Sequence, residues 1–244
     1  MKKIGIISGK GGSGKSIIAS SLAKELSKES NTLLIDSDLG FRTLDLMLNC
    51  ENTIYDIYDF SMGIEDEMCI NKVEDNEKLN FLCASQSKTV DDIDFSKIKD
   101  NLDTLSKYEY VIVDIPRDEK TIVAWADIVD EFILITEDND ISLRLTDKIM
   151  YIFIKNKIRR PIKVVFNKVD SNKEFDLEKK YELFMGPNVK IISKIPKFYN
   201  IEEEDLEEFL LFIRDIVEVI KGNDIVFREK KVEEKTFIQK LLGK

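Results

Sequence analysis

The chain has 244 residues, of which 43% are hydrophobic and 34% are charged, a globular composition that suits one large α/β domain better than two small ones. A formal net charge of −10 and a pI near 4.8 argue against a protein that coats itself in nucleic acid, because binding to a phosphate backbone needs a basic face. The chain has no histidine and its 3 cysteines form no C-x-x-C pair, which excludes a zinc or histidine-ligated metal site.

Short apolar runs rich in β-branched residues alternate along the chain with longer segments of helical period. We expect strands at residues 3–8, 32–36, 79–83, 110–115, 132–136, 162–167 and 189–193. We expect helices at residues 15–28, 96–107, 141–157, 175–185 and 202–220. Nearly continuous apolar strands separated by helices predict a doubly wound α/β fold, a mostly parallel sheet of about seven strands with helices on both faces.

The N-terminus and the hydropathy of the chain point away from export and from a membrane span. MKKIGIISG carries only a short apolar run before its glycines, which favours a first strand over a secretory signal. No stretch approaches the roughly 20 apolar residues that a spanning helix needs. We therefore expect a cytoplasmic protein.

The loop after the first expected strand reads SGKGGSGKS and fits the phosphate-binding pattern G-x-x-x-x-G-K-[ST]. Its glycines allow backbone N–H groups to turn toward a phosphate, Lys15 can neutralise β- and γ-oxygens, and the Ser16 hydroxyl can ligate Mg²⁺. A strand before the loop and a helix after it are the context that this motif requires. We expect the nucleotide to contact Gly9, Lys10, Gly11, Gly12, Ser13, Gly14, Lys15 and Ser16.

Lys10 is a second lysine in a loop that needs one. Its charge adds repulsion near Lys15 unless a phosphate lies close enough to compensate both, although an ordinary surface lysine is the alternative. KGGSGKS resembles the deviant Walker A motif of the MinD/ParA family of ATPases. That resemblance implies that Lys10 crosses a dimer interface and acts on the nucleotide of the second subunit, as an arginine finger does.

The resemblance to this family extends over most of residues 1–170. IDSDLGFRTLDLMLNCENTIYDIYDF at 35–60 and FLCASQSK at 81–88 are similar to stretches specific to MinD and its close relatives, and YVIVDIP at 110–116 matches their Walker B strand. The chain is therefore identified as a MinD-like member of the MinD/ParA family. A P-loop NTPase fold of the SIMIBI type, with ATP and Mg²⁺ as ligands, is what this resemblance implies.

The resemblance also implies roles for three aspartates at expected strand ends. Asp36 would reach Mg²⁺ through water, Asp38 would orient the attacking water, and Asp114 would hold the metal through its water shell. With Ser16, this gives Ser16, Asp36 and Asp114 as the metal set and Lys10, Lys15 and Asp38 as the catalytic set. The alternative for each aspartate is a turn residue at a strand-to-helix junction.

Two positions depart from the family pattern. Asp118 stands where a glycine is usual after Asp114, and this puts a carboxylate near the γ-phosphate or the dimer face, with Arg117 beside it as a compensating or solvent-facing charge. Thr43 replaces an asparagine of the first switch. Hydrolysis rate and partner response are the properties that these changes affect.

The base-recognition segment reads Asn167-Lys168-Val169-Asp170, which matches the N-K-x-D pattern of GTPases. MinD-like proteins also place an asparagine here to contact adenine, so Asn167 is expected under both interpretations and Asp170 is the discriminating residue. The GTPase switch motif D-x-x-G is absent after Asp114, so ATP is favoured over GTP.

The last ten residues, KTFIQKLLGK, place four apolar side chains within about 140° of a helix and all three lysines outside that arc. Such a short helix can form when its apolar face enters an anionic membrane, and MinD proteins resemble this chain in ending that way. The alternative is a helix docked on its own core. We expect a P-loop domain at 1–226, a charged linker and tail at 227–244, and membrane contacts from Phe237, Ile238, Lys240, Leu241 and Leu242.

These features predict an ATPase, slow and partner-stimulated, that dimerises on ATP, binds the inner face of the cell membrane and is released on hydrolysis. Division-site selection with a regulator of MinE or MinC type is the expected setting. The alternatives are a flagellar-placement ATPase of FlhG type and a nucleotide-binding scaffold that hydrolyses poorly. A DNA segregator of ParA type is disfavoured by the acidic charge, and iron–sulfur relatives by the cysteine spacing.

Overall fold

The computed structural model describes residues 1–170, 176, 188–201 and 205–224. Eight strands form one sheet in the order β3-β4-β2-β5-β1-β6-β7-β8, and every neighbouring pair is parallel except β3 with β4. The strands are β1 (Lys2–Ser8), β2 (Thr32–Asp36), β3 (Asn71–Val73), β4 (Asn76–Leu82), β5 (Tyr110–Asp114), β6 (Glu131–Thr136), β7 (Ile162–Val169) and β8 (Val189–Pro196).

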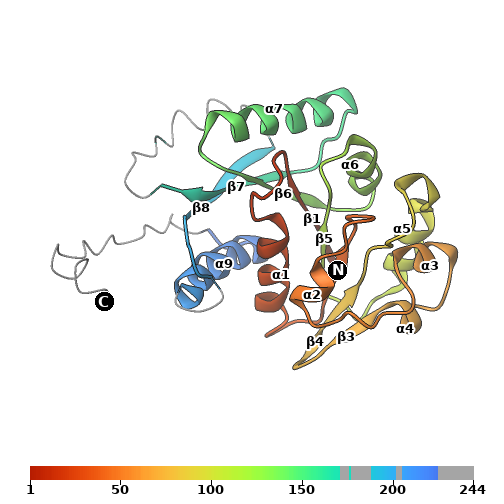
Figure 1. Cartoon of the computed structure of the whole chain (residues 1–244). Coiled ribbons are helices and arrows are strands. Elements are labelled where there is room, and N and C mark those ends of the chain that lie inside the picture. The colour runs from red at the N-terminus through yellow and green to blue at the C-terminus, as the bar shows by residue number, and fades with distance from the viewer. Residues whose placement is uncertain (171–175, 177–187, 202–204, 225–244) are drawn as a thin grey trace.

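Helices cover both faces of this sheet (Figure 1). Buried side chains of α1 (Lys15–Leu26), α2 (Leu44–Met47) and α9 (Leu206–Lys221) share one core cluster with one side of the strands. The other core cluster takes in α3 (Ile57–Met62), α4 (Asp66–Cys69), α5 (Phe95–Thr104), α6 (Glu119–Ala126) and α7 (Asp140–Lys155). A 3₁₀ turn, η1 (Val90–Asp92), precedes α5. The predicted doubly wound fold is thereby confirmed.

Successive side chains of a strand point to opposite faces of the sheet, and both faces are buried here, which explains why the strands are apolar at nearly every position. In β5, Val111 and Val113 enter one core cluster and Ile112 enters the other, and all three are fully buried. A strand covered on both faces gains from an apolar side chain at each residue, so the runs lack the polar alternation of a one-sided sheet. The burial of both faces is what the sequence pattern encodes.

Helix α9 closes the core on the side of α1. Seven of its residues are buried, and Gly222 ends it in a left-handed conformation with φ 97°. Two polar contacts from other elements also fix it, since Lys2 Nζ donates to the Ile220 carbonyl at 2.7 Å and Arg214 pairs with Glu25 at 3.2 Å. Its packing makes α9 part of the main domain rather than an appendage.

All seven expected strands are present, while the short elements between them were missed. Strand β3 has three residues and pairs antiparallel with β4 across a tight turn at Asp75, whose φ is 60°. Helices α2, α3, α4 and α6 have four to eight residues, too few for periodicity to show. Most of the helix expected at 175–185, the start of the helix expected at 202–220 and the whole tail lie outside the described residues.

We predict that Phe212→Ala lowers the free energy of unfolding by about 3–5 kcal/mol, because Phe212 is 1% exposed in the α9 core. Chemical denaturation followed by circular dichroism measures this change. The matched control is Leu211→Ala, since Leu211 is 37% exposed on the same helix and its truncation should cost roughly 1 kcal/mol or less. Equal effects of the two substitutions would show that α9 does not pack as described.

Candidate functional site

The glycine-rich loop joins β1, an inner strand of the sheet, to α1, which begins at Lys15. Gly9 lies against the backbone of α7, where a Cβ atom would fall 2.5 Å from the carbonyl of Leu145. Gly14 has φ 92° at the N-cap of α1, and a Cβ atom there would fall 2.5 Å from Nδ2 of Asn167. Only glycine fits at either position, so the loop is held between α7 and the end of β7.

Asn167, on β7 two strands away from β1, contacts this loop directly. Its Nδ2 donates to the Ser13 carbonyl at 2.7 Å, and the residue is 7% exposed. The structure thus places Asn167 beside the loop, with its amide nitrogen engaged by the loop backbone. The adenine contact expected for Asn167 stays a prediction, as does the discriminating role of Asp170, which follows β7.

Asp114, at the carboxyl end of β5, binds two side chains of the phosphate-loop motif, Lys15 and Ser16. Lys15 Nζ forms an ion pair with Asp114 Oδ1, and Ser16 Oγ donates to Asp114 Oδ2 at 2.6 Å. The Asp114 side chain is 2% exposed and that of Lys15 is 13% exposed. Because a buried carboxylate needs compensation, this ion pair and hydrogen bond stabilise the charge of Asp114 in the way that a bound cation would.

Asp36 stands beside Asp114 in the parallel register of β2 and β5. Its Oδ1 accepts from the Asp38 N–H at 2.9 Å, whereas its buried Oδ2 has no hydrogen-bond partner among the described residues. Burial raises the pKa of Asp36 to about 7, and the hydrogen bond from Asp38 only partly opposes that shift. Together with the Ser16 hydroxyl and the Asp114 carboxylate, the buried and unsatisfied Asp36 Oδ2 makes up a set of oxygen ligands that fits Mg²⁺.

Asp38 follows on the segment after β2 and is half-buried. Burial raises its pKa, while the positive charge of Lys15 acts in the opposite direction. A hollow of about 280 Å³ is lined by Asp38, Phe41, Lys88, Pro116 and Asp118, among others. The segments after β2 and after β5 therefore meet at one place, where the family resemblance puts the two switches.

Asp118 is the N-cap residue of α6, a role that the sequence analysis did not predict. Its side chain accepts from the Thr121 N–H at 2.9 Å and caps the N-terminus of α6. Its φ of −77° is open to any residue, so this chain has no conformational need for the usual glycine here. Arg117 is exposed and lies by the loop, since a Cβ atom on Gly11 would be 3.7 Å from its Nη1. Thr43 occupies the N-cap position of α2 without capping it through its side chain.

Glu137 is a site residue that the sequence analysis missed. Its Oε2 accepts from Lys10 Nζ at 2.6 Å and from Asn139 Nδ2 at 2.9 Å, and its Oε1 lies 3.8 Å from Lys168 Nζ. Lys168 also donates to the Gly12 carbonyl. Burial acts to raise the pKa of Glu137, but the hydrogen bonds from Lys10 and Asn139 outweigh it and hold that pKa below its usual value. The sequence indicates only that Glu137 directly follows the strand expected at 132–136, whereas the pairing of that strand with β1, which brings Glu137 to the loop, comes from the structure.

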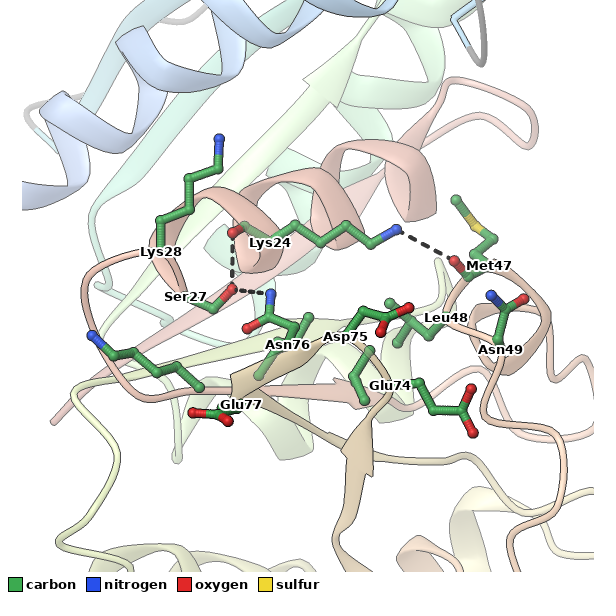
Figure 2. A pocket seen from close by; sticks show the side chains of 13 residues that line it. Lys24, Ser27, Lys28, Met47, Leu48, Asn49, Glu74, Asp75, Asn76 and Glu77 are labelled. Atoms are coloured by element: carbon green, nitrogen blue, oxygen red, sulfur yellow. Dashed lines mark hydrogen bonds between the residues drawn. The ribbon is translucent and has the colours of Figure 1, made fainter.

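A second hollow, of about 650 Å³, lies at the other end of α1 (Figure 2). Asn76 donates to Ser27 Oγ at 2.8 Å there, and Lys24 Nζ reaches the Met47 carbonyl at 3.4 Å. None of the site residues expected from the sequence lines it. Because α1 begins at the phosphate loop and ends here, this hollow belongs to the amino edge of the sheet, opposite the edge where ligands of such folds bind.

The five residues expected to contact a membrane lie outside the described residues. Among the helices of the described ranges, none has both the length and the apolar character that crossing a bilayer takes.

Comparison with known proteins places this geometry in context. Residues 4–209 match the sequence model of the CobQ/CobB/MinD/ParA nucleotide binding domain. The chain is 29% identical over 270 aligned positions to the septum site-determining protein MinD of Escherichia coli K12, covering 98% of this chain and 97% of that protein.

Solved structures show the same similarity. MinD in the MinC:MinD cell division protein complex of Aquifex aeolicus superposes with a TM-score of 0.81 at 25% identity, covering 94% of this chain and 99% of that one. MinD of Pyrococcus horikoshii, solved with Mg-ADP, gives a TM-score of 0.71 at 22% identity over 90% of this chain and 95% of that one.

We predict that Asp36→Asn flattens the pH dependence of stability of the protein without nucleotide or Mg²⁺. The folded-state pKa of about 7 lies above the unfolded value of 3.8, so between these values the folded chain holds a proton that the unfolded chain has released. Stability therefore falls as pH rises through this window, by up to roughly 1.4 kcal/mol per pH unit, and an asparagine cannot contribute to that slope.

Urea denaturation between pH 5 and pH 8 measures the effect. Asp140→Asn, which removes an exposed carboxylate at the start of α7, is the control and should keep the slope of the unsubstituted chain. Equal slopes for Asp36→Asn and the unsubstituted chain would contradict the prediction.

Proposed function

The chain belongs to the CobQ/CobB/MinD/ParA nucleotide binding domain family, and on that premise we propose that it is a MinD-like ATPase whose dimerisation and membrane residence follow its nucleotide state. The observation that carries the proposal is the meeting of the loop with three aspartates at one edge of the sheet. Lys15 and Ser16 both bind Asp114, which stands in register with Asp36.

The contacts at this edge support phosphate and Mg²⁺ binding. Lys15, now paired with Asp114, would turn its ammonium group to the β- and γ-phosphates, and the Ser16 hydroxyl would be free to ligate the metal. Asp36 and Asp114 would hold the metal through its water shell. Bound Mg²⁺ supplies neutralisation of the charge that develops on the phosphate oxygens.

Asp38 is the residue that we assign to the attacking water. It is half-buried, follows Asp36 by two residues and lines the hollow between the segments after β2 and after β5. A carboxylate in such a place can accept a proton from water or fix its orientation. A nucleotide-binding scaffold that hydrolyses poorly is the alternative that Asp118 favours, because the charge of Asp118 lies near Asp38 and opposes a second negative group there.

Lys10 provides the link between nucleotide and assembly. Its side chain is 35% exposed at the rim of the loop, a position that supports a contact with the phosphate of a second copy. Two subunits facing each other through their loops would each place Lys10 on the nucleotide of the other, so ATP would be the bridge that favours an ATP-dependent homodimer.

The proposed membrane step rests on the sequence of the tail, residues 227–244. One short amphipathic helix with Phe237, Ile238, Leu241 and Leu242 on its apolar face binds an anionic surface weakly and reversibly. A dimer presents two such tails, and the second binds at a high effective concentration. Hydrolysis would separate the dimer and release both tails from the inner face of the cell membrane.

The likeness to MinD from a MinC:MinD complex supports a regulator of MinC or MinE type and a role in positioning the division site. A flagellar-placement ATPase of FlhG type would share the same switch and differ in its partners. The domain division at residue 226 belongs to the same proposal, because α9, whose buried face packs in the core, ends at Lys221.

We predict that the full-length protein sediments with anionic liposomes in Mg²⁺-ATP and stays in the supernatant with ADP or without nucleotide. Lys10→Ala should abolish sedimentation by preventing dimerisation. Leu241→Glu should abolish it by placing a charge in the apolar arc, whereas Gln239→Glu adds the same charge outside the arc and should have little effect.

Equal sedimentation in every nucleotide state would refute the nucleotide gate. Undiminished binding of Leu241→Glu would exclude the tail as the anchor.

A second prediction concerns the base. ATP should displace a fluorescent adenine nucleotide at a lower concentration than GTP, because Asn167 lies beside the loop and no D-x-x-G switch follows Asp114. Inorganic triphosphate is the control for binding through the phosphates alone. Tighter binding of GTP than of ATP would assign the Asn167–Asp170 segment to guanine.

A further inference from the structure

Lys10, the lysine proposed to act on a second subunit, is held inside its own chain. Its Nζ lies 2.6 Å from Glu137 Oε2, and the Glu137 side chain is only 11% exposed. A charge-assisted hydrogen bond of this length to a mostly buried carboxylate is among the stronger polar contacts in a protein. Lys10 therefore starts from a paired state when a second copy approaches.

Glu137 is fixed in place by contacts other than Lys10. Asn139 Nδ2 donates to the same Oε2 at 2.9 Å, while Asn139 Oδ1 accepts from the Ser142 N–H at 3.0 Å and so caps α7. Glu137 also directly follows β6, which is buried in the sheet. Because the carboxylate is tied to α7 and to β6, it cannot follow Lys10 toward a partner, so Lys10 has to leave it.

The surroundings make this exchange possible. Lys168 Nζ stands 3.8 Å from Glu137 Oε1 and is itself held near the loop by the Gly12 carbonyl. When Lys10 departs, Lys168 and Asn139 remain to compensate the Glu137 carboxylate, which is then not left buried without a partner. The pair can open, but opening it costs free energy that only a strong competing anion offsets.

We infer that Glu137 is a positioning residue that retains Lys10 within its own subunit and thereby sets how readily ATP assembles the dimer. A phosphate of the partner's nucleotide competes with the Glu137 carboxylate for the same ammonium group. ATP, with one more phosphate charge than ADP, is the stronger competitor, so the pair sharpens the distinction between the two nucleotides. This inference rests on the proposed function of Lys10.

Sedimentation velocity with Mg²⁺-ATP tests it, in an Asp38→Ala background so that the nucleotide is not consumed. Glu137→Gln keeps the size and a hydrogen-bonding group but removes the charge. Two pairs open for each dimer, so Glu137→Gln should lower the dimer dissociation constant about tenfold. Glu137→Asp, which keeps the charge, and Asp140→Asn, which removes a nearby exposed charge, should change it by less than about threefold.

A double substitution shows whether Glu137 acts through Lys10. In a Lys10→Ala background, Glu137→Gln should neither restore nor strengthen the dimer, because no ammonium group is left to release. Binding of a fluorescent ADP to the monomer, measured for each variant, establishes that the variants are folded. A structural role of Glu137 would change ADP binding as well as dimerisation.

The outcomes separate the inference from the proposed function. If the Asp38→Ala chain forms no dimer in ATP at any concentration, the proposed function fails. If it dimerises, Lys10→Ala abolishes the dimer, and Glu137→Gln leaves the dissociation constant unchanged or raises it, the inference alone is overturned.

Discussion

The buried charge of Asp114 is the constraint on which the site depends. Its carboxylate ends an inner strand of the sheet at 2% exposure, and the fold satisfies it with Lys15 and Ser16 from the loop after β1. A carboxylate in such a position cannot be left alone, because the penalty for a buried, unpaired charge is several kcal/mol. The pairing therefore fixes the start of α1 against β5. It also holds Lys15 and Ser16, the side chains that would bind phosphate and Mg²⁺, in place before any ligand is bound.

The same edge of the sheet concentrates negative charge, and this has a thermodynamic cost. Asp36 and Asp114 stand side by side in register, with Asp38 two residues away and a buried oxygen of Asp36 unsatisfied within the described chain. Such an arrangement weakens the protein without ligand and favours the binding of cations. Lys15 meets part of that need from within the chain. The site is thus most stable when it is filled, which is a common property of sites that bind metal and phosphate together.

Sequence alone predicted the sheet because apolar runs are a local pattern, and it named several side chains that the structure brings together at one edge of that sheet, although their roles stay predictions. The apolar runs predicted every strand but the three-residue β3, the loop pattern pointed to Lys15, and the family resemblance pointed to Asp36 and Asp114 at expected strand ends. Glu137 and the capping role of Asp118 escaped because they depend on which strands lie side by side and on where a short helix begins. A strand end next to the phosphate loop is recognisable only once the strand order is known. The tail, residues 235–244, lies outside the described chain and keeps its status as a prediction.

The close approach of Gly9 to α7 has a further consequence, which concerns how a movement of the loop would spread through the protein. The phosphate loop contacts the backbone of α7 at Leu145 directly, because Gly9 has no side chain to separate the two segments. No adjustable side chain lies between them that could take up a movement of the loop. A shift of the loop on filling would be passed to the whole helix as a rigid rod. The outer surface of α7 carries Ile141, Tyr151 and Ile154, which are 68%, 61% and 74% exposed. Because one helix bears both the contact with the loop and these exposed apolar side chains, a displacement of the loop would also move an outer surface of the protein.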